Sequence, residues 1–312
     1  MRFPTAALAL PLVLGSLVPV VACAAPAVPP RTAARTTSEV MAAAQPSEWR
    51  RLDPENTLYL ELATGRVVFE LAPEFAPNHV ANIKALAREK YFDGLAILRS
   101  QDNYVVQWGD PDGEDAAQRR PIAHAARTLP AEFHRAIDSA LPFTPLPDGD
   151  VYAPLVGFSG GFPIARDPGS GKTWLTHCYA MLGSGRGDTA DSGGGTELYV
   201  VIGHAPRHLD KNVTLVGRAV SGMKLLSTLP RGSGALGFYE KREQYVPVVS
   251  VRVAADLPPA ERTELELLRT DTPAFAALVE ARRHRREEWF LDPVGRVELC
   301  NVPLPVRAVA PR

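Results

Sequence analysis

The sequence predicts a mainly β protein with a small number of helices. Residues 56–63 and 66–71 alternate apolar and polar side chains around Thr64-Gly65, which is the pattern of a β-hairpin. The segment 76–90 breaks this alternation, because its apolar residues recur at helical spacing. Further runs of β-branched and aromatic residues predict strands at 104–108, 179–182, 196–203, 215–220 and 246–253.

The helical patterns fall in two parts of the chain. Within 76–90, Pro77 stands near the start, where its missing N–H group is harmless. Two further helical patterns, 261–269 and 273–286, follow the last predicted strand. The second ends in a basic run, residues 282–286, but two glutamates follow directly. A solvated helix face is therefore the favoured interpretation of this run, and a patch for nucleic acid or anionic lipid is the alternative.

Composition is that of an ordinary globular protein and argues against a nucleic-acid partner. The 312 residues are 46% hydrophobic and 22% charged, which is ample for a buried core. A formal net charge of -1 provides no broad positive surface for a nucleic-acid backbone. The 29 prolines gather near the N-terminus, in 121–168 and near the C-terminus, which indicates extended segments and loops around a core.

The N-terminal residues 1–23 predict an export signal. Arg2 supplies a positive start, and 6–22 are apolar and uncharged but interrupted by two prolines. The Val-Val-Ala-Cys sequence that ends at Cys23 resembles a lipobox, in which the cysteine becomes the lipidated first residue of a bacterial lipoprotein. Ordinary signal-peptide cleavage is the alternative. Either route predicts a periplasmic protein, attached to the membrane through Cys23 in the first case, and 24–54 then predict a flexible tether.

The other two cysteines, Cys178 and Cys300, would reach an oxidising compartment after export. A disulfide between them would fasten the C-terminal part of the chain to the preceding domain. Free thiols are the favoured alternative, because Cys178 lies beside a predicted core strand and buried thiols are common in cores.

The most informative pattern lies in residues 91–111. Tyr-Phe-Asp-Gly at 91–94 is typical of a turn, with glycine supplying backbone freedom after aspartate. A short apolar run then leads to Arg99, a single positive charge. The strand-like residues 104–108 follow, and Gly-Asp-Pro at 109–111 ends them.

This stretch resembles the central motif of the cyclophilins, which are peptidyl-prolyl cis-trans isomerases. That motif has a Tyr-Asp-Gly turn, a His-Arg pair, and then Phe, Met, Gln, two glycines and Asp. Leu98 stands at the histidine place and Trp108 at the place of one glycine, while Asn82 matches an asparagine of the preceding helix. The residues that match the motif in register are Tyr91, Asp93, Gly94, Arg99, Gln107, Gly109 and Asp110.

The resemblance implies a closed antiparallel β-barrel of about eight strands, flanked by two α-helices, over residues 55–255. Residues 112–177 are rich in Pro, Gly and Asp and are expected to form a long insertion loop. Residues 256–312 lie beyond the resemblance and predict a helical C-terminal extension without an assigned function. The chain is expected to be a monomer.

The resemblance also implies the site. Arg99 corresponds to the family's arginine that donates to the substrate amide, and Gln107 to its donor to the substrate backbone; these are the expected catalytic residues. Glu197 stands where the family has glutamine, so the resemblance implies a negative charge near Arg99 that is able to pair with it and restrain it. The expected substrate-binding residues are Tyr104, Val105, Met181, Glu197, Tyr199 and His208.

Neither a metal nor a cofactor is expected. The seven histidines show no metal-ligand spacing, and His134 and His177 are expected at the surface. The runs 157–161, 169–173 and 232–237 match a nucleophile elbow, a phosphate loop and a dinucleotide fingerprint only in part or by letter. Each lacks a residue or a flanking element that its motif requires.

The predicted chemistry needs no nucleophile. Rotation about an X–Pro bond faces a barrier of about 18–20 kcal/mol, and a preorganised arginine can donate to the amide nitrogen as the bond twists. The sequence therefore predicts an isomerase that assists the folding of exported, proline-containing polypeptides. The alternative is a module that binds proline-containing segments without useful catalysis. Arg99 and Gln107 favour the enzyme, whereas Leu98, Trp108 and Glu197 favour the binding module.

Overall fold

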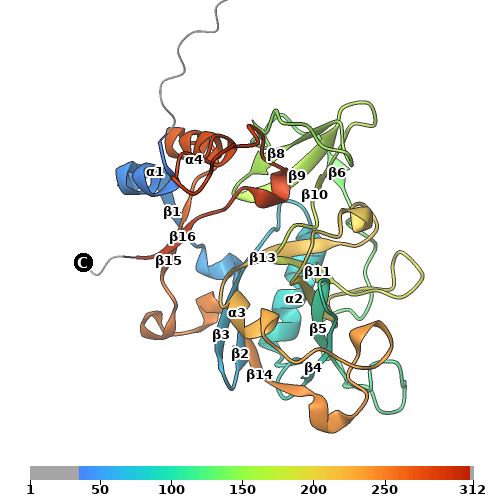
Figure 1. Ribbon diagram of the computed structural model, residues 1–312. Coiled ribbons are helices and arrows are strands. Elements are labelled where there is room, and N and C mark those ends of the chain that lie inside the picture. The colour runs from blue at the N-terminus through green and yellow to red at the C-terminus, as the bar shows by residue number, and fades with distance from the viewer. Residues whose placement is uncertain (1–34, 310–312) are drawn as a thin grey trace, which may run out of the picture. The chain divides into compact units, whose positions relative to one another are not determined.

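A closed barrel of eight antiparallel strands forms the centre of the computed structural model, which describes residues 35–309 (Figure 1). Around the barrel the strands follow the order β11-β12-β5-β4-β14-β2-β3-β13. The predicted barrel is therefore confirmed. Its strands are β2 (Thr57–Leu62), β3 (Gly65–Leu71), β4 (Ala96–Ser100), β5 (Val105–Gly109), β11 (Met181–Ser184), β12 (Leu198–Val201), β13 (Leu215–Ser221) and β14 (Val246–Val253).

Two helices accompany the barrel, as predicted. Helix α2 (Pro77–Arg88) lies against β14 and buries the apolar side chains that recur at helical spacing. Helix α3 (Met223–Ser227) is a single turn after Gly222, whose φ of 84° suits glycine. Short 3-10 helices are η1 (Pro46–Glu48), η2 (Pro54–Asn56), η3 (Arg207–Leu209), η4 (Ala235–Gly237), η5 (Arg242–Gln244), η6 (Ala254–Asp256), η7 (Pro259–Glu261) and η8 (Leu299–Asn301).

The predicted loop over 112–177 is wrong from residue 135 onward, where the chain forms a five-stranded antiparallel sheet in the order β6-β10-β9-β8-β7. Gly160 and Gly161 adopt positive φ between two of these strands, and Gly171 does so at the next turn. The glycines, prolines and aspartates of these turns hid the short strands in the sequence pattern. The strands are β6 (Arg135–Ala136), β7 (Thr144–Pro145), β8 (Leu155–Ser159), β9 (Phe162–Asp167) and β10 (Lys172–Leu175).

The predicted tether and the predicted all-helical extension are both corrected, because the two ends of the described chain build one layer. Strand β15 (Leu265–Leu268) pairs with both β1 (Trp49–Arg51) and β16 (Val306–Ala308). Beside this sheet, helix α1 (Thr37–Ala43) packs against helix α4 (Pro273–Arg283) (Figure 1). Only α4 fits the helical prediction for this region.

Local patterns explain both corrections. Helix α1 begins with a capping box, in which Thr36 and Glu39 satisfy each other's backbone N–H groups. The Ala/Thr/Ser bias of this segment concealed that signal. In the predicted helix 261–269, Leu265 and Leu267 are buried while Glu266 between them is not. That period of two is a strand pattern. The segment forms a strand and not a helix because β1 and β16 pair with it on its two sides.

The predicted signal peptide, Cys23 and residues 24–34 lie outside the described residues. Within residues 35–309, none of the helices combines the length and the apolar character that crossing a bilayer requires.

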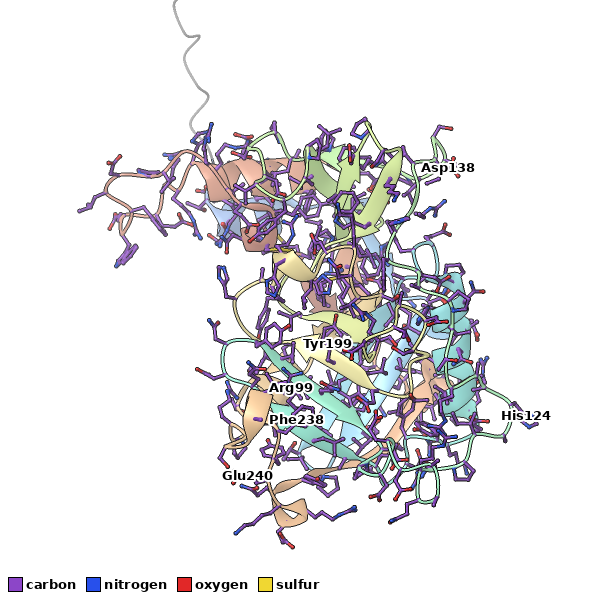
Figure 2. All side chains as sticks on the ribbon, turned by 90° about the vertical axis from the view of Figure 1, so that its right-hand side faces the viewer. Arg99, His124, Asp138, Tyr199, Phe238 and Glu240 are labelled. Carbon is purple, nitrogen blue, oxygen red and sulfur yellow. A yellow bond between two sulfur atoms is a disulfide. The ribbon has the colours of Figure 1, made fainter. Side chains whose placement is uncertain are left out.

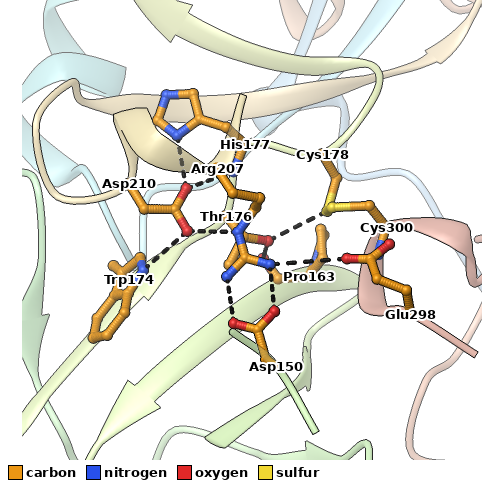
Figure 3. The surroundings of a disulfide bond; sticks show 10 residues. All are labelled: Asp150, Pro163, Trp174, Thr176, His177, Cys178, Arg207, Asp210, Glu298 and Cys300. Carbon is orange, nitrogen blue, oxygen red and sulfur yellow. Dashed lines mark hydrogen bonds and ion pairs between the residues drawn. A yellow bond between two sulfur atoms is a disulfide. The ribbon is translucent and has the colours of Figure 1, made fainter. Parts of the chain in front are cut away.

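Cys178 and Cys300 form a disulfide (Figure 3). The favoured prediction of free thiols is therefore wrong, and the disulfide, which was the less favoured prediction, is confirmed. Cys178 is buried beside the barrel core, as expected. The sequence could not show that η8 brings Cys300 to it, because this approach depends on how the terminal layer packs. The bond fastens that layer to the segment preceding β11.

We expect the disulfide to contribute substantially to stability. The bond joins residues 122 apart in sequence, so replacing both cysteines by alanine should lower the free energy of unfolding by about 2–4 kcal/mol, measured by urea denaturation. Cys23→Ser keeps the bond and should leave this free energy unchanged. Equal stability of the double variant and this control would contradict the prediction.

Candidate active site

A cleft of about 560 Å³ lies on the outside of the barrel over β4, β5 and β12. Figure 2 shows Arg99, Phe238 and Tyr199 close together on this face. The barrel strands supply its floor, and the loop that contains η4 supplies one wall. The predicted site residues that line the cleft are Arg99, Tyr104, Val105, Gln107, Glu197 and Tyr199.

A β-bulge aims Arg99 at this cleft. Strand β4 pairs with β5 so that Ile97 faces Trp108 but Arg99 faces Gln107, which leaves Leu98 as the extra residue. A bulge bends its strand locally and re-aims the side chains next to it. Leu98 and Arg99 consequently both border the cleft, although they are consecutive in a strand.

The guanidinium of Arg99 is held in a fixed position. Its Nε donates to the carbonyl oxygen of Leu236 at 2.6 Å, and its terminal nitrogens donate to the side-chain oxygens of Gln101 and of Gln107, the latter at 3.1 Å. The rings of Tyr104 and Phe238 lie 5.5 and 5.3 Å from it. Three of five N–H groups are used within the described chain, so two can reach a ligand.

Burial lowers the pKa of Arg99, but an arginine keeps its proton in proteins. The cleft therefore contains a permanent, partly desolvated positive charge. Such a charge interacts more strongly with a developing dipole than it would in water.

Gln107 connects Arg99 to Glu197. Its side-chain oxygen accepts from Arg99, and its Nε2 donates to the carboxylate of Glu197 at 2.6 Å. The expected pairing of Glu197 with Arg99 is therefore indirect, because the amide lies between them. This orients the Gln107 amide and leaves its second N–H for a ligand. Burial raises the pKa of Glu197, and the hydrogen bond from Gln107 opposes that rise.

The floor of the cleft rests on a buried hydrogen-bonded chain that the sequence did not reveal. The hydroxyl of Tyr199 lies 2.9 Å from Nε2 of His177, whose Nδ1 lies 2.9 Å from Asp210. Asp210 accepts from Arg207, which in turn pairs with Asp150 through two bonds of 2.9 and 3.0 Å. The chain links β12 of the barrel to the loop before β8.

The prediction that His177 lies at the surface is wrong, because it is completely buried. Burial lowers its pKa even though Asp210 opposes this, so the ring is neutral at neutral pH. A neutral ring that donates from Nδ1 to Asp210 accepts at Nε2, and the hydroxyl of Tyr199 is then the donor. Tyr199 on its predicted strand could have been the signal, since the hydroxyl of a buried tyrosine needs a hydrogen-bond partner.

Close packing also fixes the Tyr199 ring. Gly183 on the adjacent strand β11 pairs with it, and a Cβ at this glycine would overlap the ring. The Tyr199 ring thus packs directly against the backbone of Gly183, and His177 fixes its hydroxyl.

Two predicted binding residues do not reach the cleft. Met181 on β11 is buried in the core that surrounds the disulfide. His208 lies exposed on η3 and does not border the cleft, whereas its neighbour Leu209 does. A short 3-10 helix turns one residue inward and the next outward, so alignment by position alone selected the wrong one.

Other cleft residues were missed or differ from expectation. Phe238 lies far along the chain from Arg99, and backbone contacts between its loop and β4 bring it to the cleft. Trp108, which favoured the binding module, points into the barrel and packs against Phe69, so it does not obstruct the site. Within residues 35–309 no cluster of potential ligands could hold a metal ion.

We expect Glu197→Gln to stabilise the fold at neutral pH. Because the pKa of Glu197 is raised in the folded protein above its value near 4.5, the native state binds more protons than the unfolded state, and ionisation above that range destabilises the fold. The gain should be largest above the raised pKa and disappear below about pH 4.5, where both states are protonated.

Urea denaturation across this pH range measures the effect. Glu243→Gln changes an exposed carboxylate and should show no such dependence on pH. A variant at position 197 that is less stable than the wild type at neutral pH would mean that the hydrogen bond to Gln107 outweighs the cost of burial.

Comparison with known proteins identifies relatives of this chain. The model of the family "Cyclophilin type peptidyl-prolyl cis-trans isomerase/CLD" matches residues 57–253. A probable peptidyl-prolyl cis-trans isomerase of Brucella suis is 29% identical over 189 residues, which cover 59% of this chain and 76% of that protein. The human peptidyl-prolyl cis-trans isomerase-like 1 is 38% identical over 73 residues, which cover 23% of this chain and 42% of the human protein.

Among solved structures, a cyclophilin from Hirschia baltica is similar over nearly its whole length. The two share 25% identity with a TM-score of 0.68, and the match covers 89% of this chain and 99% of the other. The likeness therefore extends beyond the residues that the family model matches. Because that model covers more than half of the sequence, the chain belongs to the family of cyclophilin-type peptidyl-prolyl cis-trans isomerases.

Proposed function

We propose that this enzyme accelerates the folding of exported polypeptides by catalysing rotation about their X–Pro bonds, with Arg99 as the residue that stabilises the twisted amide. The observation that carries the proposal is the position of Arg99. Its charge is permanent, partly desolvated and fixed above an apolar floor, with two N–H groups directed to no partner in the described chain.

The cleft can hold a prolyl ring and its amide together. Val105, Leu209 and Val213 provide apolar surface, and the rings of Tyr104 and Phe238 flank the charge. As the bond twists, resonance is lost and the nitrogen becomes an acceptor. A donor fixed where that acceptor develops binds the transition state more strongly than the planar ground state.

Gln107 has the second role. Its amide is oriented by Arg99 on one side and Glu197 on the other, which leaves one Nε2–H for a backbone carbonyl of the substrate. A charge-assisted hydrogen bond from Arg99 is worth about 1.5–3 kcal/mol. A millionfold acceleration needs roughly 8 kcal/mol, so orientation and apolar binding must supply the remainder.

Export is supported by two observations from different parts of the chain. Residues 1–23 have the pattern of an export signal. The Cys178–Cys300 disulfide belongs to a class of bond that persists in oxidising compartments such as the periplasm. We infer that exported polypeptides with proline are the substrates, and that lipidation at Cys23 holds the enzyme at the membrane.

A binding module without useful catalysis is the second candidate. One observation favours it: both polar atoms of the Gln107 amide already have partners inside the cleft. If the amide cannot release or share these partners, substrate binding would persist without acceleration. A protease-coupled isomerisation assay on an Ala-Pro peptide separates the two candidates.

Arg99→Ala should lower kcat/KM by about 10- to 150-fold, because a charge-assisted donor worth about 1.5–3 kcal/mol to the transition state is lost. Arg99→Lys should also be poor, since an ammonium cannot reproduce the planar guanidinium. Circular dichroism should show both variants folded. Arg269→Ala removes an exposed arginine whose guanidinium pairs with nearby Asp271, and it should keep full activity. Full activity of Arg99→Ala would refute this mechanism.

Cys23→Ser should abolish metabolic labelling with fatty acid and move the protein out of the membrane fraction. Two or more acyl chains give stable anchoring, whereas a single chain binds marginally. A wild-type protein that is unlabelled and already soluble in the periplasm would contradict lipidation, but it would leave the isomerase proposal intact.

A further inference from the structure

The loop between α4 and η8, residues 284–298, displays large apolar side chains to solvent. Trp289 is 82% exposed, Leu291 94% and Val294 88%. We call these three side chains the apolar tip. Figure 2 shows this loop extending away from the rest of residues 35–309, next to the point where the described chain begins.

The loop has a defined structure beneath its tip. Phe290 packs edge-on against Trp289 with ring centroids 5.0 Å apart, and the guanidinium of Arg285 lies 4.6 Å from the Phe290 ring. At the other end, the N–H of Val297 donates to Asp148 at 3.3 Å, and Val297 is buried. The chain is therefore anchored on both sides, and its local packing leaves the apolar tip outward.

Arginines precede and follow the apolar tip in the sequence, with carboxylates among them, and Arg285 pairs with Glu287. Residues 282–296 contain five arginines against two glutamates and one aspartate, which gives a net charge of +2 with His284 neutral. Arg283 is paired with Asp148 and Glu280 and supports the loop. Arg296 is exposed and follows the apolar tip in the sequence.

The loop base lies beside the first described residues. Hydrogen bonds from Thr36, and then the charges of Arg286 and Arg35, hold the pKa of Glu39 below its ordinary value. Arg35 and Arg286 therefore both lie near Glu39 on α1. Arg35 is connected through residues 24–34 to Cys23 and the apolar segment 6–22.

We propose that the apolar tip inserts into the interfacial layer of a membrane while the neighbouring arginines meet anionic lipid headgroups. Tryptophan is enriched at this depth because its ring is apolar and its N–H group is polar. Apolar residues flanked by arginine are the usual composition of segments that lie in the interface. The inference does not depend on the isomerase activity.

Size and shape favour a membrane over a protein partner. A stable protein interface buries about 1,200–2,000 Å² in total, which three side chains on a projecting loop do not provide. A projecting tip instead suits a fluid layer that adapts to it. If Cys23 is lipidated, the loop supplies a second membrane contact besides the lipid anchor, and two contacts fix an orientation that one anchor cannot.

Tryptophan fluorescence can test this directly. The other three tryptophans, Trp49, Trp108 and Trp174, are at most 8% exposed, so a change of emission on lipid binding reports Trp289. Full-length Cys23→Ser protein is mixed with vesicles of phosphatidylcholine and phosphatidylglycerol at roughly two to one. We expect a shift to shorter wavelength and quenching by brominated lipid, both absent in Trp289→Phe.

A variant that keeps the reporter tests the rest of the tip. Leu291→Ser with Val294→Ser should require about tenfold more lipid for half of the emission shift. Val151→Ser is the matched control, since this valine is 92% exposed but lies in the loop before β8. Isomerisation of a soluble peptide should be unchanged in every variant, because none of these residues borders the cleft.

Two results would overturn the proposal. The first is emission that neither shifts nor is quenched with vesicles, whatever fraction of the protein sediments with them, because residues 6–22 alone can cause sedimentation. The second is an emission shift that depends on protein concentration without lipid and accompanies dimers in sedimentation velocity, which would assign the tip to a second copy of the chain.

Discussion

The buried carboxylate of Asp210 holds together the parts of the molecule that meet beneath the cleft. It accepts hydrogen bonds from the backbone and ring of His177, from Arg207 and from the indole of Trp174 (Figure 3). Burial alone would raise its pKa, but the hydrogen bond from His177 and the charge of Arg207 hold it below the ordinary value. Breaking a buried pair of this kind typically costs about 3–5 kcal/mol.

Through Asp210 the cleft depends on residues that no substrate touches. The ring of Tyr199 keeps its place because His177 holds the hydroxyl, and His177 is adjacent in sequence to the disulfide-bonded Cys178. Arg207 carries the same support to Asp150 in the sheet-bearing insertion. The extra sheet and the terminal layer are therefore part of what positions the catalytic face, rather than additions to an independent barrel.

The sequence predicted well what short-range patterns encode. Alternation around Thr64-Gly65 and helical spacing in 76–90 are local, and the motif around Arg99 carries both the turn and the site in one stretch. Prediction from the sequence failed where long-range packing determines the structure. Leu265 and Leu267 form a strand because β1 and β16 pair with it on either side. His177 was misjudged for the same reason, since nothing near it in sequence shows that Asp210 and Tyr199 converge on it.

Within the site, sequence comparison placed main-chain positions better than it placed side chains. The bulge that aims Arg99 is a feature of the backbone, and it lies within the motif that sequence comparison had aligned. Met181 and His208 were assigned by position in the sequence alone. Neighbouring residues point in different directions, so an error of one position is enough to place a side chain outside the cleft. Trp108 illustrates the converse, because a substitution that looks disruptive points into the barrel and alters the core only.

The sheet that joins both ends of the described chain constrains the order of assembly. Among the strands of residues 35–309, β1 pairs with β15 alone, and β15 is completed on its other side by β16. A polypeptide delivered N-terminus first must therefore keep α1 and β1 without their partners until β15 and α4 have arrived. Contacts so distant in sequence form slowly, since the intervening chain must be ordered first. If the proposed export takes the chain across a membrane before it folds, this layer would be among the last parts to close.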